Sequence, residues 1–404
     1  MPNLKTIQEA SQELGISTDT LRRWDKKGLI KSKRNELNYR VFDTEEIERI
    51  QSKLNGDTSK NHFKIYKNKK TYNYKVVELF AGAGGTALGF HNAGLQHALL
   101  IENDKFCVAT LKKNKPKWNI DGRDIRTVDY TGIKADIVEG GFPCQSFSYA
   151  GKRQGFGETR GTLFFEFARA VDAIKPKIAV AENVRGLETH DEGRTLKTML
   201  HTLENLGYKV AYKILKAQYF DVPQKRERII IIGVRKNLNI PILFPKEKNY
   251  IVTLREALQN VPESEGQTYS KEKEKIMNLI PQGGYWKDLP EELQKSYMGA
   301  SYYHTGGRTG MARRMSWDEP SLTLTTSPSQ KQTERCHPEE TRPFTVREYA
   351  RIQTFPDDWV FEGGITSKYK QIGNAVPVNL GYHIANGIIN MLEGNMDKDN
   401  FVIV

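Results

Sequence analysis

The stretch from Gly140 to Ser148 constrains this chain more than any other, and it reads Gly-Gly-Phe-Pro-Cys-Gln-Ser-Phe-Ser. It follows the apolar run Ala135–Val138, which is typical of a buried strand that ends in a turn. A cysteine at such a junction lies at the edge of an α/β sheet, where ligands usually bind. Because a lone cysteine is more often a small buried side chain than a nucleophile, Cys144 needs a base or a positive charge nearby to act as one.

Candidate partners for Cys144 follow on two later runs. The apolar run Ile178–Val184 predicts a strand with Glu182 near its end, where burial can raise a carboxyl pKa so that the group serves as an acid. A helix N-cap is the structural alternative for Glu182. Residues 224–228 lead into a buried strand, and their alternation predicts that three long polar side chains share one face: Gln224, Arg226 and Arg228.

A glycine-rich turn precedes this region. Residues 75–80 predict a strand and residues 81–85 the turn into a helix, where glycine lets the backbone approach a ligand closely. The pattern fits a nicotinamide dinucleotide as well as S-adenosylmethionine. Acidic residues at the ends of the next predicted strands suit a ribose. A solvated surface group would explain any one of these acids, but not all three: Glu102, Asp104 and Asp124.

Composition adds limits to this interpretation. A length of 404 residues predicts two or three domains. The net charge of +12 indicates a polyanionic partner, although a merely soluble basic protein has the same composition. The three cysteines, Cys107, Cys144 and Cys336, form no Cys-x-x-Cys pair, which argues against a disulfide framework or a zinc site and favours a reducing cytosol. No signal peptide or membrane-spanning apolar run is evident, so we expect a soluble intracellular protein.

The first 54 residues predict a separate helical module. Residues 6–14 have helical spacing, and Ser17 can cap a second helix over residues 18–27 that Gly28 ends. Two helices joined by a tight turn follow the helix-turn-helix plan of DNA-binding modules. A small helical interaction module that never touches DNA is the alternative. The residues expected to meet DNA are Thr20, Arg22, Arg23 and Arg40.

Two parts of this chain resemble known protein families. Thr20-Leu21-Arg22-Arg23-Trp24, Gly28-Leu29-Ile30 and Tyr39-Arg40 resemble the winged helix-turn-helix of MerR-type transcription regulators, although the polar, Lys-rich residues 55–73 read as a linker where that family has a dimerisation helix. Gly140–Ser148 resembles the catalytic loop of the DNA (cytosine-5) methyltransferases. Further signature elements follow in that family's order over residues 74–392: Phe80-Ala81-Gly82-x-Gly84-Gly85, Glu182-Asn183-Val184, Gln224-x-Arg226-x-Arg228, residues 342–356 and residues 371–377.

The second resemblance implies a fold and a chemistry. The fold class is α/β, with a largely parallel, Rossmann-like S-adenosylmethionine-dependent methyltransferase sheet and a smaller target-recognition domain, beside the N-terminal helix-turn-helix domain. The Cys144 thiolate would attack carbon 6 of a cytosine flipped out of the duplex, Glu182 would bind ring nitrogen 3 and the amino group, and Arg228 the ring oxygen, with Arg226 steadying the set. No metal is needed.

The resemblance also implies a cofactor site and DNA contacts. S-adenosylmethionine, which leaves as S-adenosylhomocysteine, would contact Phe80, Ala81, Gly82, Gly84, Gly85, Glu102 (ribose), Asn103, Asp124 (adenine), Ile125, Pro143, Leu163 and Asn374. The glycine-rich basic segment 148–157 suits a loop that closes over the flipped base. Together with the N-terminal module, the expected DNA contacts are Gln145, Ser148, Lys152, Arg153, His304, Arg308 and Arg313.

These observations predict the modification enzyme of a bacterial restriction-modification system. It would act as a monomer on duplex DNA in the cytoplasm, associated with the nucleoid, with a restriction endonuclease as a functional rather than physical partner and with the N-terminal module repressing its own gene. A transcription regulator with an inactive methyltransferase fold and an RNA cytosine-5 methyltransferase stay open as alternatives. The expected domains are 1–54 (helix-turn-helix), 55–73 (linker), 74–240 (catalytic), 241–342 (target recognition) and 343–404 (a return to the catalytic domain).

Overall fold

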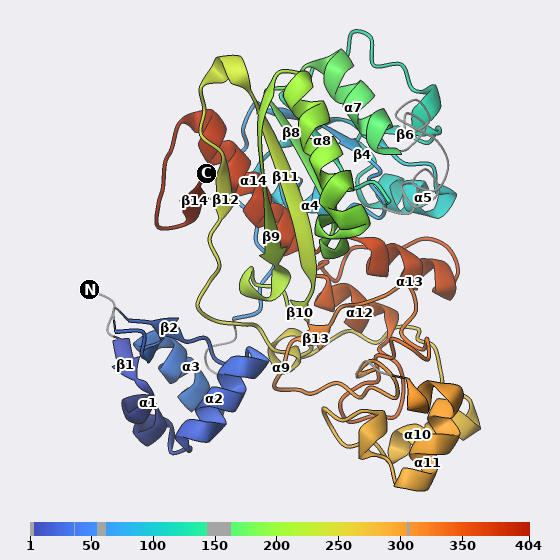
Figure 1. Cartoon of the computed structure of the whole chain (residues 1–404). Helices are drawn as coiled ribbons and strands as arrows, with labels where there is room; N and C mark the ends of the chain where they lie inside the picture. The colour runs from blue at the N-terminus through green and yellow to red at the C-terminus, as the bar shows by residue number, and fades with distance from the viewer. Residues whose placement is uncertain (1–3, 36, 55–61, 144–162, 305–307) are drawn as a thin grey trace. The chain divides into compact units, whose positions relative to one another are not determined.

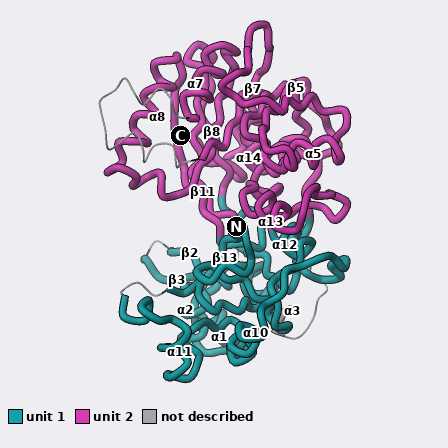
Figure 2. The backbone as a smooth tube through the Cα atoms, turned by 90° about the vertical axis from the view of Figure 1, so that its right-hand side faces the viewer, with its two compact units in different colours: residues 1–64, 218–225, 247–352 teal, residues 65–217, 226–246, 353–404 magenta. Residues whose placement is uncertain are grey.

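The structure is a computed structural model, and it describes residues 4–35, 37–54, 62–143, 163–304 and 308–404. The chain divides into two compact units, coloured separately in Figure 2. Unit 1 comprises residues 1–64, 218–225 and 247–352, and unit 2 comprises residues 65–217, 226–246 and 353–404. The linear domain boundaries expected from the sequence stay predictions.

Unit 2 is built on a seven-stranded sheet, counted over the described residues, in the order β6-β5-β4-β7-β8-β11-β9 (Figure 1). Its strands run in one direction except β11, which is antiparallel to both of its neighbours. This confirms the largely parallel α/β sheet. The strands are β4 (Lys75–Leu79), β5 (Gln96–Ile101), β6 (Ile120–Asp121), β7 (Ile137–Gly140), β8 (Ile178–Val184), β9 (Tyr208–Lys216) and β11 (Glu227–Arg235).

Helices cover the sheet because its strands carry apolar side chains on both faces. On one face, Val77 and Ile229 join a core cluster with Phe167 of α7 and Met199 of α8. The alternate residues of the same strands point to the other face, and α14 packs closely along α4. The helices of unit 2 are α4 (Gly85–Ala93), α5 (Lys105–Asn114), α7 (Leu163–Ile174), α8 (Arg194–Asn205), α13 (Ile365–Asn374) and α14 (Val378–Glu393), and a separate strand pair is β12 (Leu243–Pro245) with β14 (Phe401–Ile403).

The N-terminal part of unit 1 has the two predicted helices with the predicted caps. The Ser17 hydroxyl accepts the Thr20 N–H (3.1 Å), and Gly15 and Gly28 end their helices with φ of 64° and 73°. Leu21, Phe42 and Ile47 belong to its small apolar core. Its elements are β1 (Leu4–Thr6), α1 (Ile7–Leu14), α2 (Thr18–Lys27), β2 (Lys33–Arg34), β3 (Arg40–Asp43) and α3 (Thr44–Leu54).

In the rest of unit 1, strands and helices do not alternate regularly. Short helices surround a cluster that contains Met277, Trp286 and the buried Cys336. The elements are β10 (Gln224–Lys225), α9 (Leu254–Ala257), α10 (Lys271–Asn278), α11 (Glu291–Met298), β13 (Ser321–Leu322) and α12 (Val346–Ile352). Among the helices that the structure describes in either unit, none is long and apolar enough to cross a membrane.

Candidate active site

The glycine-rich turn after β4 lies against the end of β5. Phe80, Gly82 and Gly84 have positive φ angles of 60°, 53° and 86°, which only glycine adopts easily. One Glu102 carboxylate oxygen accepts the Gly82 N–H at 2.8 Å and the other accepts the Asp104 N–H at 2.7 Å. Glu102 therefore fixes the turn to the adjacent strand end, as expected of two neighbouring parallel strands that share one ligand-binding edge.

Close packing requires glycine at the start of α4. A Cβ atom on Gly84 would lie 2.7 Å from Leu111 and 3.2 Å from the Trp359 ring, and one on Gly85 would lie only 2.0 Å from the Val376 carbonyl oxygen. The turn is thus packed directly against the segment that joins α13 to α14. This juxtaposition brings Asn374, the last residue of α13, to the same edge as Gly85, whose Cβ would be 3.2 Å from Ala375.

The other predicted cofactor residues supply both polar and apolar surface. Asp124 caps a short 3₁₀ turn (Ile125–Thr127) and pairs with Arg126 at 2.5 Å, and these hydrogen bonds lower the pKa of Asp124 to about 2. Phe80 and Leu163 are half-buried and pack on the edge of the core. Carboxylates together with half-buried apolar side chains fit a cofactor that joins a ribose to an adenine ring, so the residues present suit S-adenosylmethionine.

Glu182 and Arg228 form an ion pair at the same edge of the sheet. The Arg228 Nε lies 2.7 Å from Glu182 Oε1, and the two side chains are 12% and 14% exposed. The register explains the pair, because β8 and β11 are antiparallel with Ile230 opposite Glu182 and Arg228 opposite Val184. At this low exposure a charge pair is screened less than on the surface.

The segment that leads to Cys144 passes beside this pair. A Cβ on Gly141 would lie 3.2 Å from Glu182 Oε2, and the Asn183 side-chain amide donates to the Phe142 carbonyl at 2.9 Å. Pro143 is exposed at the end of this segment. The following predictions lie outside the described residues: Cys144, Gln145, Ser148, Lys152 and Arg153.

The shared face predicted for Gln224, Arg226 and Arg228 is wrong as a description of one strand. The chain forms two strands, β10 and β11, with Arg226 between them. Gln224 accepts the Leu324 N–H at 2.9 Å, whereas the buried Arg226 donates to the carbonyls of Gly373 (3.2 Å) and Asn374 (3.4 Å). The alternation failed because β10 pairs with β13 and so departs from the sheet that β11 joins.

The predicted DNA contacts in unit 1 differ in their surroundings. Arg22 and Arg23 of α2 are exposed, with Arg22 paired to Asp19 at 2.6 Å, and Thr20 is half-buried. Arg40 is held within the module by Asp25 at 2.8 Å.

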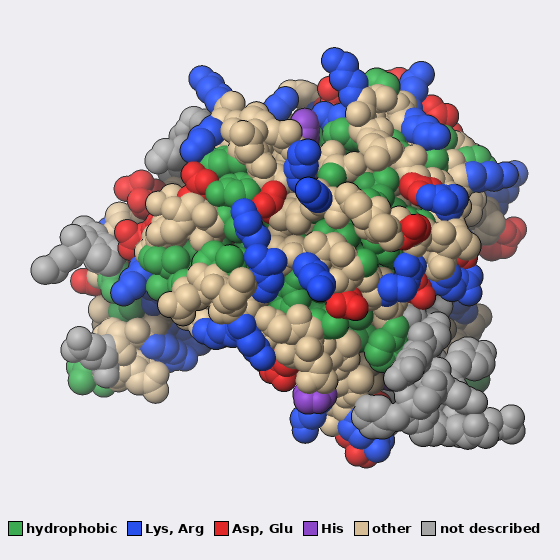
Figure 3. All heavy atoms as spheres, turned by 90° about the horizontal axis from the view of Figure 1, so that it is seen from above, with side chains coloured by type: hydrophobic (Ala, Val, Ile, Leu, Met, Phe, Trp, Pro, Cys, Tyr) green, Lys and Arg blue, Asp and Glu red, His purple; other side chains and the backbone are tan. Residues whose placement is uncertain are grey.

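Farther along unit 1, His304 is exposed and Arg308 is half-buried with a φ of 43°. Arg313 lies over the Tyr285 ring at 5.8 Å, and burial lowers its pKa. Figure 3 shows Lys and Arg side chains spread over one face of the molecule among acidic ones rather than gathered in a single patch. These contacts stay predictions.

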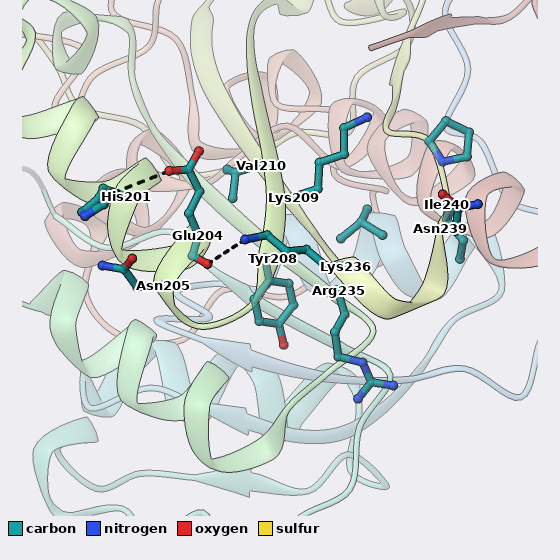
Figure 4. A pocket seen from close by; sticks show the side chains of 12 residues that line it. His201, Glu204, Asn205, Tyr208, Lys209, Val210, Arg235, Lys236, Asn239 and Ile240 are labelled. Carbon is teal, nitrogen blue, oxygen red and sulfur yellow. Dashed lines mark hydrogen bonds and ion pairs between the residues drawn. The ribbon is translucent and has the colours of Figure 1, made fainter.

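A surface cavity of about 730 Å³ in unit 2 contains none of the predicted site residues (Figure 4). It lies where β9 begins at Tyr208 and β11 ends at Arg235, the sheet edge opposite Glu182 and Arg228. The Lys236 ammonium there already donates to the Glu204 carbonyl at 3.3 Å. Over the described residues, no group of three or more His, Cys, Asp or Glu side chains is arranged to hold a metal ion.

Sequence reasoning missed several residues that shape the site. Gln353 binds the end of α13, Trp359 packs on Gly84, and Lys370 pairs with Asp104 at 3.2 Å. Gln353 lies in the segment 342–356, which resembles a family motif, but the motif does not indicate that Gln353 binds the end of α13. None of the three side chains has a spacing pattern that predicts its contact.

Comparison with known proteins shows both the fold and the family of this chain. The methyltransferase EhMeth of Entamoeba histolytica has a solved structure that matches with a TM-score of 0.56 at 14% identity, over 81% of this chain and 100% of that one, so the fold is that of a methyltransferase. The family model of C-5 cytosine-specific DNA methylases matches residues 74–390, and the chain belongs to this family. It is therefore a DNA cytosine-5 methyltransferase.

Two relatives match almost the whole chain. The Type II methyltransferase M.Eco47II of Escherichia coli is 53% identical over 403 residues, and M.Sau96I of Staphylococcus aureus is 46% identical over 415 residues, with 96% of this chain and 96% of the relative covered in both cases. Separately, the model of the MerR family regulatory proteins matches residues 6–42.

Proposed function

We propose that this protein is the modification enzyme of a restriction-modification system, which methylates carbon 5 of one cytosine within a specific duplex sequence. Similarity to two Type II methyltransferases along nearly their entire length supports the biological role. The observation that carries the chemistry is the Glu182–Arg228 pair beside Gly141, since it puts an acid and a cation next to the segment that leads to Cys144.

Each proposed catalytic residue has a defined task. The Cys144 thiolate adds to carbon 6 of the flipped cytosine, which makes carbon 5 nucleophilic. Glu182 holds ring nitrogen 3 and the amino group, and Arg228 holds the ring oxygen, so that charge pushed into the ring is stabilised. After the methyl transfer, loss of the carbon 5 proton expels Cys144 as a thiolate and restores the aromatic ring.

The methyl donor is proposed to be S-adenosylmethionine, which supplies an electrophilic methyl group when bound. Residues of unit 2 would hold it: Glu102 the ribose, Asp124 the adenine with Leu163 against that ring, and the turn from Phe80 to Gly85 the amino-acid end. The apolar side chains of Phe80 and Leu163, which are half-buried at this edge, would supply apolar surface against the bound donor.

The direct test is to incubate the protein with S-adenosylmethionine and mixed-sequence duplex DNA and to map methylated cytosines by bisulfite sequencing. We expect one short motif, lost in Cys144→Ala. Cys107→Ala is the matched control, because burial raises the pKa of Cys107 and keeps it a thiol. Methylation that persists in Cys144→Ala would contradict the mechanism, and methylation of transfer RNA in place of duplex DNA would favour the RNA alternative.

A second function is proposed for residues 1–54, on the observation that two exposed arginines stand on a capped helix in a segment that matches MerR regulators. The module would bind the control region of the enzyme's own gene and repress it. Nuclease footprints of that region, made with the full chain and with a chain lacking residues 1–54, should differ. Identical footprints would contradict this role and leave the methylation assay unaffected.

A further inference from the structure

The C-terminus of α13 is held by two buried side chains from other parts of the chain. The last carbonyls of a helix have no partner within the helix. Arg226 donates to the carbonyls of Gly373 and Asn374, at 3.2 and 3.4 Å. Gln353 donates through its amide nitrogen to the carbonyls of Ile372 (2.7 Å) and Ala375 (3.0 Å). Four consecutive carbonyls are thus bound from outside.

The two donors are well suited to hold a backbone in place. Arg226 is 2% exposed and Gln353 is fully buried. A guanidinium offers several donors in a rigid plane, so that one side chain can serve two adjacent carbonyls. The Ile372 carbonyl also accepts the Ala375 N–H at 3.2 Å, but loss of the other bonds would leave carbonyls in these buried surroundings short of a donor, which makes displacement of this segment costly.

The segment they hold presents one side chain outward. From Gln371 to Val378 every residue is buried except Asn374. The residues after it pack on the glycine turn, since a Cβ on Gly85 would overlap the Val376 carbonyl. Asn374 therefore stands exposed beside the turn that begins α4, at the edge where Glu102 follows β5.

A further set of contacts fixes the other side of α13. The Lys370 ammonium lies 3.2 Å from Asp104 Oδ2, and the Thr110 hydroxyl donates to Gln371 Oε1 at 2.7 Å. Both partners belong to the cap and body of α5, directly after Glu102. The helix is thereby tied to the same strand end as the predicted ribose ligand.

We propose that Arg226 and Gln353 are positioning residues for the cofactor, acting through Asn374. They keep the end of α13 in the one placement in which the Asn374 side chain reaches the bound methyl donor. This assigns Arg226 to the cofactor half of the site rather than to the cytosine. The inference rests on the proposed function, because S-adenosylmethionine is taken as the occupant.

The test measures the affinity of the full chain for S-adenosylhomocysteine by titration calorimetry, which needs no turnover. Arg226→Lys and Gln353→Met keep much of the side-chain volume and remove donors. We expect each to weaken binding about tenfold, as the loss of one or two buried hydrogen bonds implies. Arg235→Gln is the matched control: its guanidinium also donates to a backbone carbonyl, that of Lys175 at 3.1 Å, but at the far end of β11.

A double-mutant cycle separates positioning from a general loss of structure. Asn374→Ala should weaken binding by itself, and Arg226→Lys should add little to it. In kinetics, KM for S-adenosylmethionine should rise while KM for DNA stays at the wild-type value. If Arg226→Lys does not fold, Gln353→Met takes its place in the double-mutant cycle with Asn374→Ala.

Two results would overturn the inference: wild-type affinity in both variants, or effects that add fully to that of Asn374→Ala. A wild-type chain that binds no S-adenosylhomocysteine would overturn the proposed function itself, and the positioning role with it.

Discussion

At the residue scale, the charge of Glu182 is expected to matter more than its shape. Glu182→Gln keeps the size of the side chain but removes the carboxylate that pairs with Arg228 at 2.7 Å. Loss of one electrostatic stabiliser of a transition state costs about 10²- to 10³-fold in rate. We therefore expect kcat to fall by about 100-fold or more, measured by methyl incorporation into duplex DNA.

A neighbouring carboxylate provides the control for that measurement. Glu227 pairs with Arg185 at 2.6 Å, but on the surface, where such pairs contribute little. Glu227→Gln should keep nearly the wild-type rate. Equal losses in the two variants would contradict a specific role for Glu182.

Glu139 gives a second prediction at this scale, one of stability. It is buried on β7 directly opposite Glu78 on β4, and His97 lies 3.2 Å from the Glu78 carboxylate. Burial, followed by the charges of Glu78 and Glu182, raises the pKa of Glu139 well above its usual range. The folded state therefore retains a proton that the unfolded chain releases near pH 4.5.

The sign of the effect follows from this proton. Since the folded chain binds more protons, its stability falls as pH rises from about 4.5 towards the raised pKa. Glu139→Gln removes this loss, so we expect its melting temperature to exceed that of wild type at pH 8 and the gap to shrink at pH 5. Thermal unfolding at both pH values checks this, and a gap independent of pH would refute it.

At the scale of elements, local signals predicted local structure well. The caps Ser17 and Gly28 set the limits of α2, and the apolar run of residues 178–184 became β8. The interruption between strands β10 and β11 at Arg226 was not predictable from the sequence, because it depends on β10 pairing with β13 and on carbonyls nearly 150 residues away.

In the candidate site, too, the features with a local signal could be predicted, and those that depend on distant residues could not. Glu102 directly follows β5 and Glu182 lies near the end of β8, so their positions at one sheet edge could be predicted from the strands alone. Their partners could not, since the Glu182–Arg228 pair depends on the antiparallel register of β11, and a hydrophobic run does not specify strand direction. The hydrogen bonds from Arg226 and Gln353 to the end of α13 have no local signal in the sequence.

The packing of α4 yields a prediction for this scale. Alanine normally stabilises a helix relative to glycine by about 0.5–1 kcal/mol. In Gly85→Ala the new Cβ would meet the Val376 carbonyl oxygen at 2.0 Å, and a backbone atom cannot move aside cheaply. We expect a net loss of about 1–3 kcal/mol, the usual cost of overpacking, in urea-induced unfolding.

Gly186→Ala tests whether steric contact is the cause. Apart from Gly186 itself and its two chain neighbours, nothing lies within 4 Å of the place that a Cβ would take there, so the same substitution should leave the urea midpoint almost unchanged. A stable Gly85→Ala variant would mean that α4 and the α13–α14 segment are not in steric contact at this position.

At the scale of the whole molecule, the two units carry different tasks in the proposal. The N-terminal module belongs to unit 1, where Lys31 pairs with Glu247 at 3.0 Å and lies over the Tyr219 ring, and Asp43 accepts from Asn249 at 2.9 Å. All described residues proposed to bind the cofactor belong to unit 2. A ligand bound at the proposed cofactor site should therefore stabilise unit 2 and leave unit 1 unchanged.

This division can be tested with S-adenosylhomocysteine and hydrogen exchange. A ligand that binds only the folded state stabilises it by about 2.7 kcal/mol at 100 times its Kd. We expect slower exchange in unit 2, most of all in the turn after β4, the end of β5 and α13, and unchanged exchange in α10 and α11 of unit 1. Equal protection of α10 and α11 would mean that the units are energetically one body, because only then can binding energy released in unit 2 oppose local opening in unit 1.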